Sequence, residues 1–265
     1  MIQPPSFSRE MPMSAVARTL PRGSWPVMLT PFNEDHSIAW SHVDEYVEWL
    51  IERGSAGIFA VALAGEMYSL SDLECSALAA RVVARSNGRV PVIASSTAGG
   101  SARQIVDSVA RMADQGVDAV VLIPSLLARN GEPDATVRAV IDSVLDAVDD
   151  IGFGLYECPA PYHRLLSDEV LAHAAQSGRF TFVKDTTQSV RTMAERISDF
   201  PQLMFFNAHV ASLTDTLLSG GAGFSGHAAN VYPELVSWLC VNYPESDLAP
   251  LVQRLLTIAQ YAIQR

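Results

Sequence analysis

The chain has 265 residues, of which 49% are apolar and 18% are charged, and its formal net charge is −11. This apolar content excludes a disordered chain, and the length suffices for one barrel-sized domain with a substantial core. The negative charge argues against nucleic acid or an anionic membrane as a partner, and charged residues, glycine or proline interrupt every apolar run before the ~20 residues that a membrane helix needs.

Residues 1–22 lack the basic-then-apolar order of a secretory signal, so we predict a loosely ordered N-terminal extension there. The three cysteines, Cys75, Cys158 and Cys240, lie far apart in the sequence and form no CxxC pair. This usage is typical of a reducing compartment. We therefore expect a soluble protein in the cytoplasm.

Eight short apolar runs alternate with longer stretches of helical spacing after the extension. The runs cover residues 25–29, 57–62, 90–94, 119–123, 152–156, 180–184, 203–207 and 223–225. The clearest helical stretches cover residues 42–53, 73–85, 102–115 and 135–148. Runs that are apolar throughout, rather than at alternate positions, indicate parallel strands with helices on their outer faces.

The number of strand and helix units favours a closed barrel over an open doubly wound sheet, and no GxGxxG follows the first strand. We predict an α/β fold, a (β/α)8 TIM barrel over residues 23–230. Two helical stretches, residues 233–243 and 247–263, predict additional C-terminal helices within residues 231–265.

Lysine usage singles out one position. Of the 18 basic residues, only Lys184 is lysine, and it ends the apolar run 180–184. Arginine serves as well as lysine on a solvated surface, but it cannot supply a free amine because the guanidinium keeps its proton in proteins. A desolvated lysine at this position is a nucleophile that condenses with a carbonyl to give an imine. The alternative is that Lys184 extends to water or pairs with the adjacent Asp185.

In such a barrel the active site lies at the carboxyl ends of the strands. Tyr156 ends the strand that precedes the Lys184 strand, so we expect its phenol near the amine, where it would relay protons during imine formation. His209 follows the seventh strand and is a weaker candidate acid or base. Glu66 is expected to accept backbone hydrogen bonds beneath the site, and the alternative is a general base.

Several motifs follow one another in the order of a known family: TPF at residues 30–32, GE at 65–66, VPVIAS at 90–95, LYECP at 155–159, VKDTT at 183–187 and the glycine-rich stretch 220–230. In this combination the chain resembles the dihydrodipicolinate synthase and N-acetylneuraminate lyase superfamily, over about residues 23–240. The resemblance implies a (β/α)8 barrel with C-terminal helices, here shorter than usual for the family. It also implies a Schiff base between Lys184 and pyruvate or another 2-oxo acid, a proton-transferring tyrosine at Tyr156, and a homodimer or homotetramer.

Four positions depart from the family pattern. Leu63 and Ala64 stand where the family usually has two hydroxyl side chains, Leu126 stands in place of a second tyrosine, and Pro161 in place of an arginine for the second substrate. The predicted substrate-binding residues are therefore Ala64 and Gly65, whose backbone amides could receive the carboxylate of the 2-oxo acid, and Ser95 and Ser225, which end strands and carry hydroxyls.

These observations favour a metal-independent, cofactor-independent lyase that acts on a small 2-oxo acid and, in one direction, an aldehyde co-substrate. The six histidines are scattered and match no metal-binding motif, so no metal ligands are predicted. Two alternatives remain open: a non-catalytic barrel that binds a small molecule or regulates, and a dihydrodipicolinate synthase with an altered proton relay.

Overall fold

A computed structural model of the chain describes residues 19–263. Residues 1–18, most of the expected N-terminal extension, lie outside this part, so that expectation stays a prediction. Eight parallel strands form one sheet in the order β1-β8-β7-β6-β5-β4-β3-β2. The strands are β1 (Gly23–Ser24), β2 (Ile58–Val61), β3 (Val92–Ser95), β4 (Ala119–Leu122), β5 (Gly152–Tyr156), β6 (Phe180–Asp185), β7 (Met204–Asn207) and β8 (Gly223–Phe224).

The two ends of this strand order meet, because Val27, just after β1, forms a parallel bridge with Phe59 of β2. Two backbone hydrogen bonds flank the bridge, from Phe59 N to Pro26 O at 3.0 Å and from Met28 N to Phe59 O at 2.9 Å. The sheet therefore closes on itself, and the predicted eight-stranded barrel is confirmed.

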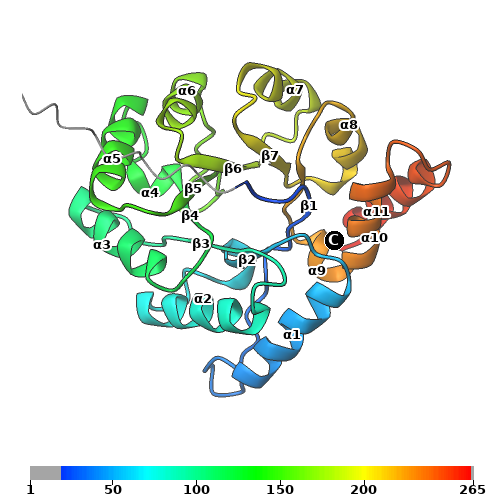
Figure 1. Ribbon diagram of the computed structural model, residues 1–265, viewed down its shortest axis with the longest axis horizontal. Coiled ribbons are helices and arrows are strands. Elements are labelled where there is room, and N and C mark those ends of the chain that lie inside the picture. Colours follow the sequence, from blue (N-terminus) through cyan, green and yellow to red (C-terminus); the bar gives the residue numbers. More distant parts are fainter. Residues whose placement is uncertain (1–18, 264–265) are drawn as a thin grey trace, which may run out of the picture.

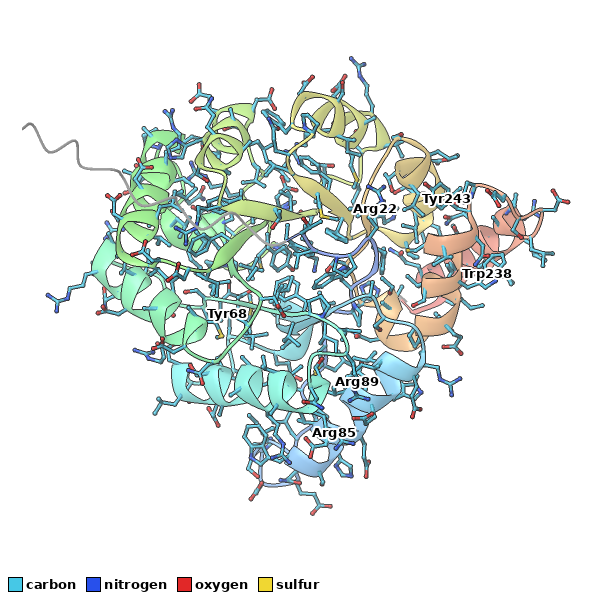
Figure 2. All side chains as sticks on the ribbon, in the orientation of Figure 1. Arg22, Tyr68, Arg85, Arg89, Trp238 and Tyr243 are labelled. Carbon is cyan, nitrogen blue, oxygen red and sulfur yellow. The ribbon has the colours of Figure 1, made fainter. Side chains whose placement is uncertain are left out.

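The helices surround the strands in chain order (Figure 1). They are α1 (Trp40–Glu52), α2 (Asp72–Ser86), α3 (Ala102–Ala113), α4 (Pro124–Leu127), α5 (Asp134–Ala147), α6 (Asp168–Ser177), α7 (Val190–Asp199), α8 (Leu213–Leu218), α9 (Ala228–Val231), α10 (Pro233–Asn242) and α11 (Ala249–Ile263), with short 3₁₀ helices η1 (Leu63–Gly65) and η2 (Val210–Ser212). Capping boxes at Ser71 and Ser101 begin α2 and α3, because each serine exchanges hydrogen bonds with the residue three positions later. Many side chains of the outer helices project into solvent around this ring (Figure 2).

Within residues 19–263, none of the helices combines the length and the apolar character needed to span a bilayer.

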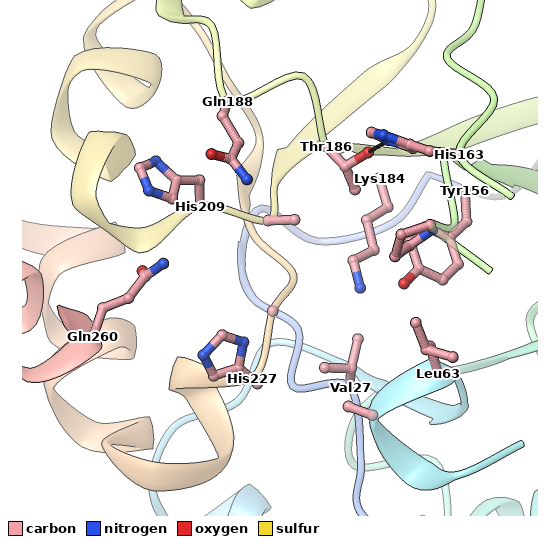
Figure 3. Close-up of a pocket in the computed structure, with 14 residues that line it drawn as sticks. Val27, Leu63, Tyr156, His163, Lys184, Thr186, Gln188, His209, His227 and Gln260 are labelled. Atoms are coloured by element: carbon pink, nitrogen blue, oxygen red, sulfur yellow. Dashed lines mark hydrogen bonds between the residues drawn. The ribbon is translucent and has the colours of Figure 1, made fainter. Parts of the chain in front are cut away.

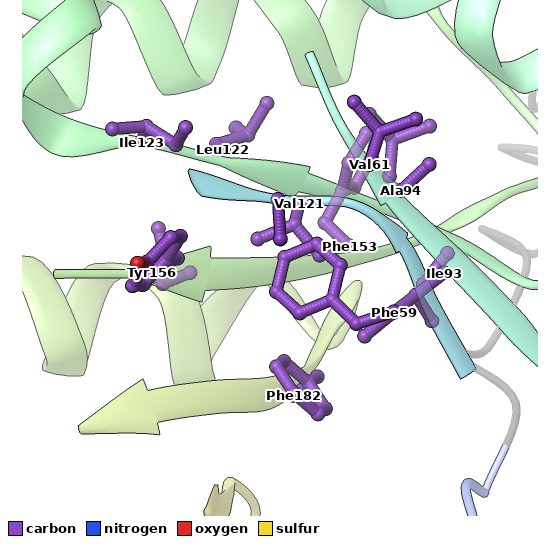
Figure 4. Close-up of a cluster of buried hydrophobic side chains, with 14 of the residues drawn as sticks. Phe59, Val61, Ile93, Ala94, Val121, Leu122, Ile123, Phe153, Tyr156 and Phe182 are labelled. Carbon is purple, nitrogen blue, oxygen red and sulfur yellow. The ribbon is translucent and has the colours of Figure 1, made fainter. Parts of the chain in front are cut away.

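Buried apolar side chains, both aliphatic and aromatic, pack beneath the carboxyl ends of the strands, and Phe59 and Phe182 are among them (Figure 4). The ring of Phe182 lies 4.5 Å from that of Phe206, 5.6 Å from that of Trp25 and 5.8 Å from that of Phe59, measured between centroids. All four side chains are fully buried. Since side chains on one face of a strand recur every second residue, Phe182 and Lys184 project from the same face of β6. These rings therefore form a dry floor under Lys184.

Closure between β1 and β8 depends on two glycines. Gly23 pairs with Gly223, and a Cβ atom on Gly223, whose φ is +153°, would lie 1.9 Å from the Gly23 carbonyl oxygen. A methyl group at this position would force β1 and β8 apart and break the pairing that links them.

We expect Gly223→Ala to lower the free energy of unfolding by about 3 kcal/mol or more, measured by urea denaturation, because the clash is with backbone. Gly88→Ala is the matched control. Gly88 also has a positive φ, +72°, but a Cβ there meets nothing within 4 Å, so only the backbone cost of about 1 kcal/mol is expected. Equal losses in the two variants would contradict the close approach of the strands.

Candidate active site

Lys184 and Tyr156 lie side by side at the carboxyl ends of β6 and β5, where the strand register pairs them directly. The Lys184 Nζ atom is 4.1 Å from the centroid of the Tyr156 ring and 5.8 Å from that of Phe59. Lys184 is 4% exposed and Tyr156 is 3% exposed. The amine lies beside the Tyr156 ring at the wall of the cavity (Figure 3), above the aromatic floor that includes Phe59.

Burial lowers the pKa of Lys184 to about 7, and the neighbouring Cys158 offsets this only in part. An ammonium ion loses its hydration in this environment, so the neutral amine is favoured. Burial likewise raises the pKa of the Tyr156 phenol, which keeps its proton at neutral pH. Near neutral pH the neutral amine is therefore accessible, beside a phenol that keeps its proton.

Asp185 does not pair with Lys184. Its carboxylate faces the other side of β6, where Oδ2 lies 2.6 Å from Arg196 Nη1 and Oδ1 accepts hydrogen bonds from Thr187 N and Oγ1. The lysine is also too buried to extend to water. Both alternatives for Lys184 that the sequence left open are therefore excluded by the geometry.

A buried ionic cluster supports the strand ends from behind. Arg196 of α7 lies 2.9 Å from the Glu157 carboxylate as well as against Asp185. Glu157 also accepts backbone hydrogen bonds from Leu166 N and Thr186 N, both at 2.8 Å. Burial raises the pKa of Glu157, whereas the positive charge of Arg196 acts in the opposite direction. Through these bonds the cluster fixes the segments that follow Tyr156 and Lys184.

A cavity of about 400 Å³ opens above the amine. Its lining comes from seven parts of the chain, including the last helix α11. The lining residues are Val27, Leu63, Ala64, Tyr156, Pro159, His163, Lys184, Thr186, Gln188, Ala208, His209, Gly226, His227 and Gln260. Apart from Lys184, the polar groups in this lining are hydroxyls, imidazoles and amides, and the lining contains neither a carboxylate nor an arginine.

The neutral form is favoured for two of the lining histidines, His209 and His227. Burial lowers the pKa of His209, and burial together with the charge of Lys184 lowers that of His227. His163 Nε2 lies 2.8 Å from Thr186 Oγ1. Sequence reasoning named only His209, because the other two follow the strands in loops whose path the sequence does not define. Gln260 was also missed, since it comes from the far end of the chain.

The residues predicted to hold a carboxylate do not all meet at this cavity. Ala64 lines it. The Gly65 amide instead donates to Ala62 O at 3.0 Å, and a Cβ on Gly65 would lie 2.5 Å from Met28 O, so this glycine serves close packing. Ser95 and Ser225 are fully buried and are not part of the lining.

Glu66 contributes nothing to the floor of the site. Its side chain is exposed, contrary to the expectation that it accepts backbone hydrogen bonds, and its own N–H donates to Leu63 O to close η1. Among the described residues, no group of three or more histidine, cysteine or acidic side chains is placed to hold a metal ion.

Residues 20–264 match the sequence model of the dihydrodipicolinate synthetase family, which is nearly the whole chain. The chain belongs to this family. A 4-hydroxy-tetrahydrodipicolinate synthase of Marinobacter nauticus is 28% identical over 219 residues, which are 82% of this chain and 74% of that protein. An uncharacterised DapA-like lyase of Halobacterium salinarum is 29% identical over 225 residues, covering 85% and 73% of the two chains.

Solved structures of family members share the fold. The dihydrodipicolinate synthase of Acinetobacter baumannii in complex with pyruvate superposes with a TM-score of 0.83 at 23% identity, covering 92% of this chain and 83% of that one. The prophage protein YagE of E. coli K12, also in complex with pyruvate, gives a TM-score of 0.84 at 23% identity, with coverage of 93% and 84%. The family resemblance stated from the motifs is thus confirmed.

Proposed function

We propose that the protein is a lyase that forms an imine between Lys184 and pyruvate or another small 2-oxo acid. The observation that carries the proposal is the buried amine itself, whose pKa burial lowers to about 7 and whose nitrogen lies 4.1 Å from the Tyr156 ring. Membership of the family and the pyruvate complexes of its relatives give independent support.

In the proposed reaction, Lys184 Nζ attacks the keto carbon of the 2-oxo acid. Tyr156 gives its proton to the oxygen of the resulting carbinolamine, and water leaves as the C=N bond forms. The imine then accepts the electron pair of the bond that breaks next to its carbon, or supplies an enamine that attacks an aldehyde in the reverse direction. Ala64, at the start of η1, is the residue of the predicted set that remains beside the cavity for the carboxylate.

The second substrate of a dihydrodipicolinate synthase is not favoured by the cavity. Leu126 and Pro161, which stand where such an enzyme has a tyrosine and an arginine, line a separate cavity with Tyr162. The wall above Lys184 offers imidazoles and amides, which suit a neutral hydrogen-bonding group better than a second anion. The same proposal includes a cytoplasmic location and assembly as a homodimer or homotetramer. The exposed apolar side chains of α11, such as Leu255 and Ile258, support the assembly.

Reductive trapping tests the proposal directly. The wild-type protein is incubated with each of a panel of 2-oxo acids, including pyruvate, and treated with borohydride; mass spectrometry of the digest then reads the modified peptide. We expect the mass of the reduced substrate on Lys184. A non-catalytic relative would bind ligand and rise in melting temperature without this adduct, and an unmodified Lys184 with every acid would overturn the proposal.

The lowered pKa gives the trapping reaction a defined pH profile. Only the neutral amine attacks the carbonyl, so we expect the initial rate of adduct formation, quenched with borohydride, to rise about tenfold per pH unit below pH 7 and to level off above pH 8. A rate that still rises tenfold between pH 9 and pH 10 is the behaviour of an ordinary lysine and would contradict a desolvated amine.

A further inference from the structure

The side of the cavity that faces away from Tyr156 has no part in the proposed imine step. Figure 3 shows His209, His227 and Gln260 around this side, with Lys184 and Tyr156 on the other. We call the side chains of His209, His227 and Gln260 the distal wall. The three residues come from the loop after β7, the loop after β8 and the helix α11, so the distal wall is assembled only by the tertiary fold.

The cavity has space for a second group beside Lys184. Ala208 and Gly226, which precede the two histidines of the distal wall in the chain, also line the cavity and fill little of it. Pyruvate has six non-hydrogen atoms, whereas a cavity of about 400 Å³ lies in the range of sites that enclose larger ligands. A 2-oxo acid joined to Lys184 would therefore leave the distal wall available to a co-substrate.

Gln260 offers a hydrogen-bond donor to this space. Its side chain is 5% exposed, and its Oε1 accepts from Val210 N at 3.2 Å. Because a backbone N–H can only donate, this bond fixes which end of the amide is the oxygen. The Gln260 Nε2 group has no protein partner within residues 19–263. A buried amide that lines the cavity thus keeps its two N–H groups for a ligand.

His209 offers an acceptor. Its Nδ1 lies 3.3 Å from Ser212 Oγ, and this hydroxyl donates its one proton to His209 O at 3.2 Å while it accepts from Asn207 Nδ2 at 3.0 Å. Nδ1 therefore carries the ring proton and donates to Ser212, which leaves Nε2 as an acceptor. Burial lowers the pKa of His209, in agreement with a neutral ring. In the described part of the chain, no protein group bonds to Nε2.

The distal wall therefore combines donors and acceptors and has no formal charge. The pKa of His227 is also lowered by burial, and a neutral imidazole adds one donor and one acceptor. A carboxylate at this wall would face the lone pair of His209 Nε2, and an ammonium ion would face the N–H groups of Gln260. A hydroxyl group both donates and accepts, so it matches the wall where either ion does not.

We propose that Gln260 and His209 select an uncharged hydroxyaldehyde as the co-substrate, through hydrogen bonds to its hydroxyl groups. The selection rests on the proposed function. Tyr156 removes a proton from the carbon next to the imine, which leaves an enamine on Lys184. The enamine carbon forms a bond to the aldehyde carbon, and Tyr156 returns the proton to the aldehyde oxygen. Water then hydrolyses the imine, which frees the amine and releases a 4-hydroxy-2-oxo acid.

Aldol addition measures this selection. The 2-oxo acid is pyruvate, or the acid of the trapping panel that gives the highest adduct yield. Glyceraldehyde, propanal and glyoxylate serve as co-substrates, and chromatography of the product gives kcat/KM for each. Propanal lacks the hydroxyl groups, and glyoxylate has a carboxylate in their place. We expect kcat/KM for glyceraldehyde to exceed that for each of the others at least tenfold, because a ligand without hydroxyls leaves buried polar groups unpaired.

Variants of two glutamines on α11 separate selection from the anchoring of the helix. Gln260→Leu should lower kcat/KM for glyceraldehyde at least tenfold and leave that for propanal within threefold. Gln260→Glu keeps an oxygen for Val210 N but loses the donors, so it should lose the preference as well. Gln253→Glu is the matched control. Gln253 also bonds to Val210, from Nε2 to O at 2.8 Å, but it does not line the cavity, so its variant should keep the preference within twofold.

The outcomes are distinct. Equal changes for glyceraldehyde and propanal in the Gln260 variants, or an equal loss of preference in Gln253→Glu, would assign Gln260 to the anchoring of α11 and overturn the selection. Borohydride trapping of the 2-oxo acid alone should stay within twofold of the wild type in all three variants. A wild type that traps the acid but does not prefer glyceraldehyde also overturns the selection, while the imine proposal stands. Absence of any adduct in the wild type is instead a failure of the proposed function.

Discussion

Replacement of Lys184 by methionine is expected to abolish imine trapping and, at the same time, to make the folded protein more stable at pH 7. The activity is lost because no other lysine exists in the chain to replace the amine, so we expect turnover to fall by at least about 10³-fold. The gain in stability follows from the same burial that makes the amine reactive.

The sign follows from the two protonation states. In the unfolded chain the pKa of Lys184 returns to its ordinary value of 10.5, whereas in the folded protein it is about 7. Between these values the unfolded state binds more protons, so the free energy of unfolding of the wild type rises with pH across this interval. Below pH 7 the amine is charged in both states, and the full cost of burying it lowers that free energy. Methionine removes a penalty on the order of 4 kcal/mol at pH 7, which shrinks to about 1 kcal/mol near pH 9.5.

Urea denaturation of both proteins at pH 7 and pH 9.5 measures this difference. Methionine suits the comparison because it is unbranched, close to lysine in length, and compatible with the surrounding aromatic rings. A variant that is no more stable than the wild type at pH 7, or a difference that does not change with pH, would contradict the burial of an uncompensated amine.

Removal of Arg196 is expected to have the opposite effect on folding. Arg196→Met leaves the carboxylates of Glu157 and Asp185 buried without a cation, and the three side chains are 6%, 0% and 2% exposed in the wild type. Loss of one partner from a buried ion pair costs about 3 to 5 kcal/mol, because the remaining charge keeps its desolvation penalty. We expect a loss of this size in the free energy of unfolding at pH 7.

The same helix provides the control. Arg191 of α7 also pairs with a carboxylate, that of Glu195, but both side chains are exposed, so Arg191→Met should change stability by about 0.5 kcal/mol or less. The deficit of Arg196→Met should shrink as pH falls, because the orphaned carboxyls bind protons more readily in the folded state than in the unfolded one. Equal effects of the two substitutions would contradict a supporting role for the cluster.

The barrel could be predicted from the sequence because its strands are short apolar runs and its helices amphipathic stretches, repeated eight times. The exact start of β1 was less predictable: the apolar run begins at Trp25, yet the pairing with β8 uses Gly23, whose small size rather than its hydropathy decides the contact. The positions of Lys184 and Tyr156 followed from the strand ends, since adjacent parallel strands carry their last residues to the same edge.

The rest of the site was less accessible to sequence reasoning. Ser95 ends β3 and Ser225 directly follows β8, but a strand that is apolar throughout does not reveal which face each residue takes, and both serines lie outside the cavity lining. His227 and Gln260 come from segments that only the tertiary fold brings to Lys184. Arg196 had no local signal at all, because one charged residue on a polar helix has the pattern of a solvent-exposed one.

The terminal helix α11 joins the barrel through its amide side chains. Gln253 donates to Val210 O and accepts from Thr214 N, and Gln260 accepts from Val210 N while it lines the cavity. One wall of the cavity above Lys184 is therefore carried by an element that takes no part in the sheet. Substitutions on the inner face of α11 can therefore reshape this wall while Lys184, Tyr156 and the strands that carry them stay in place.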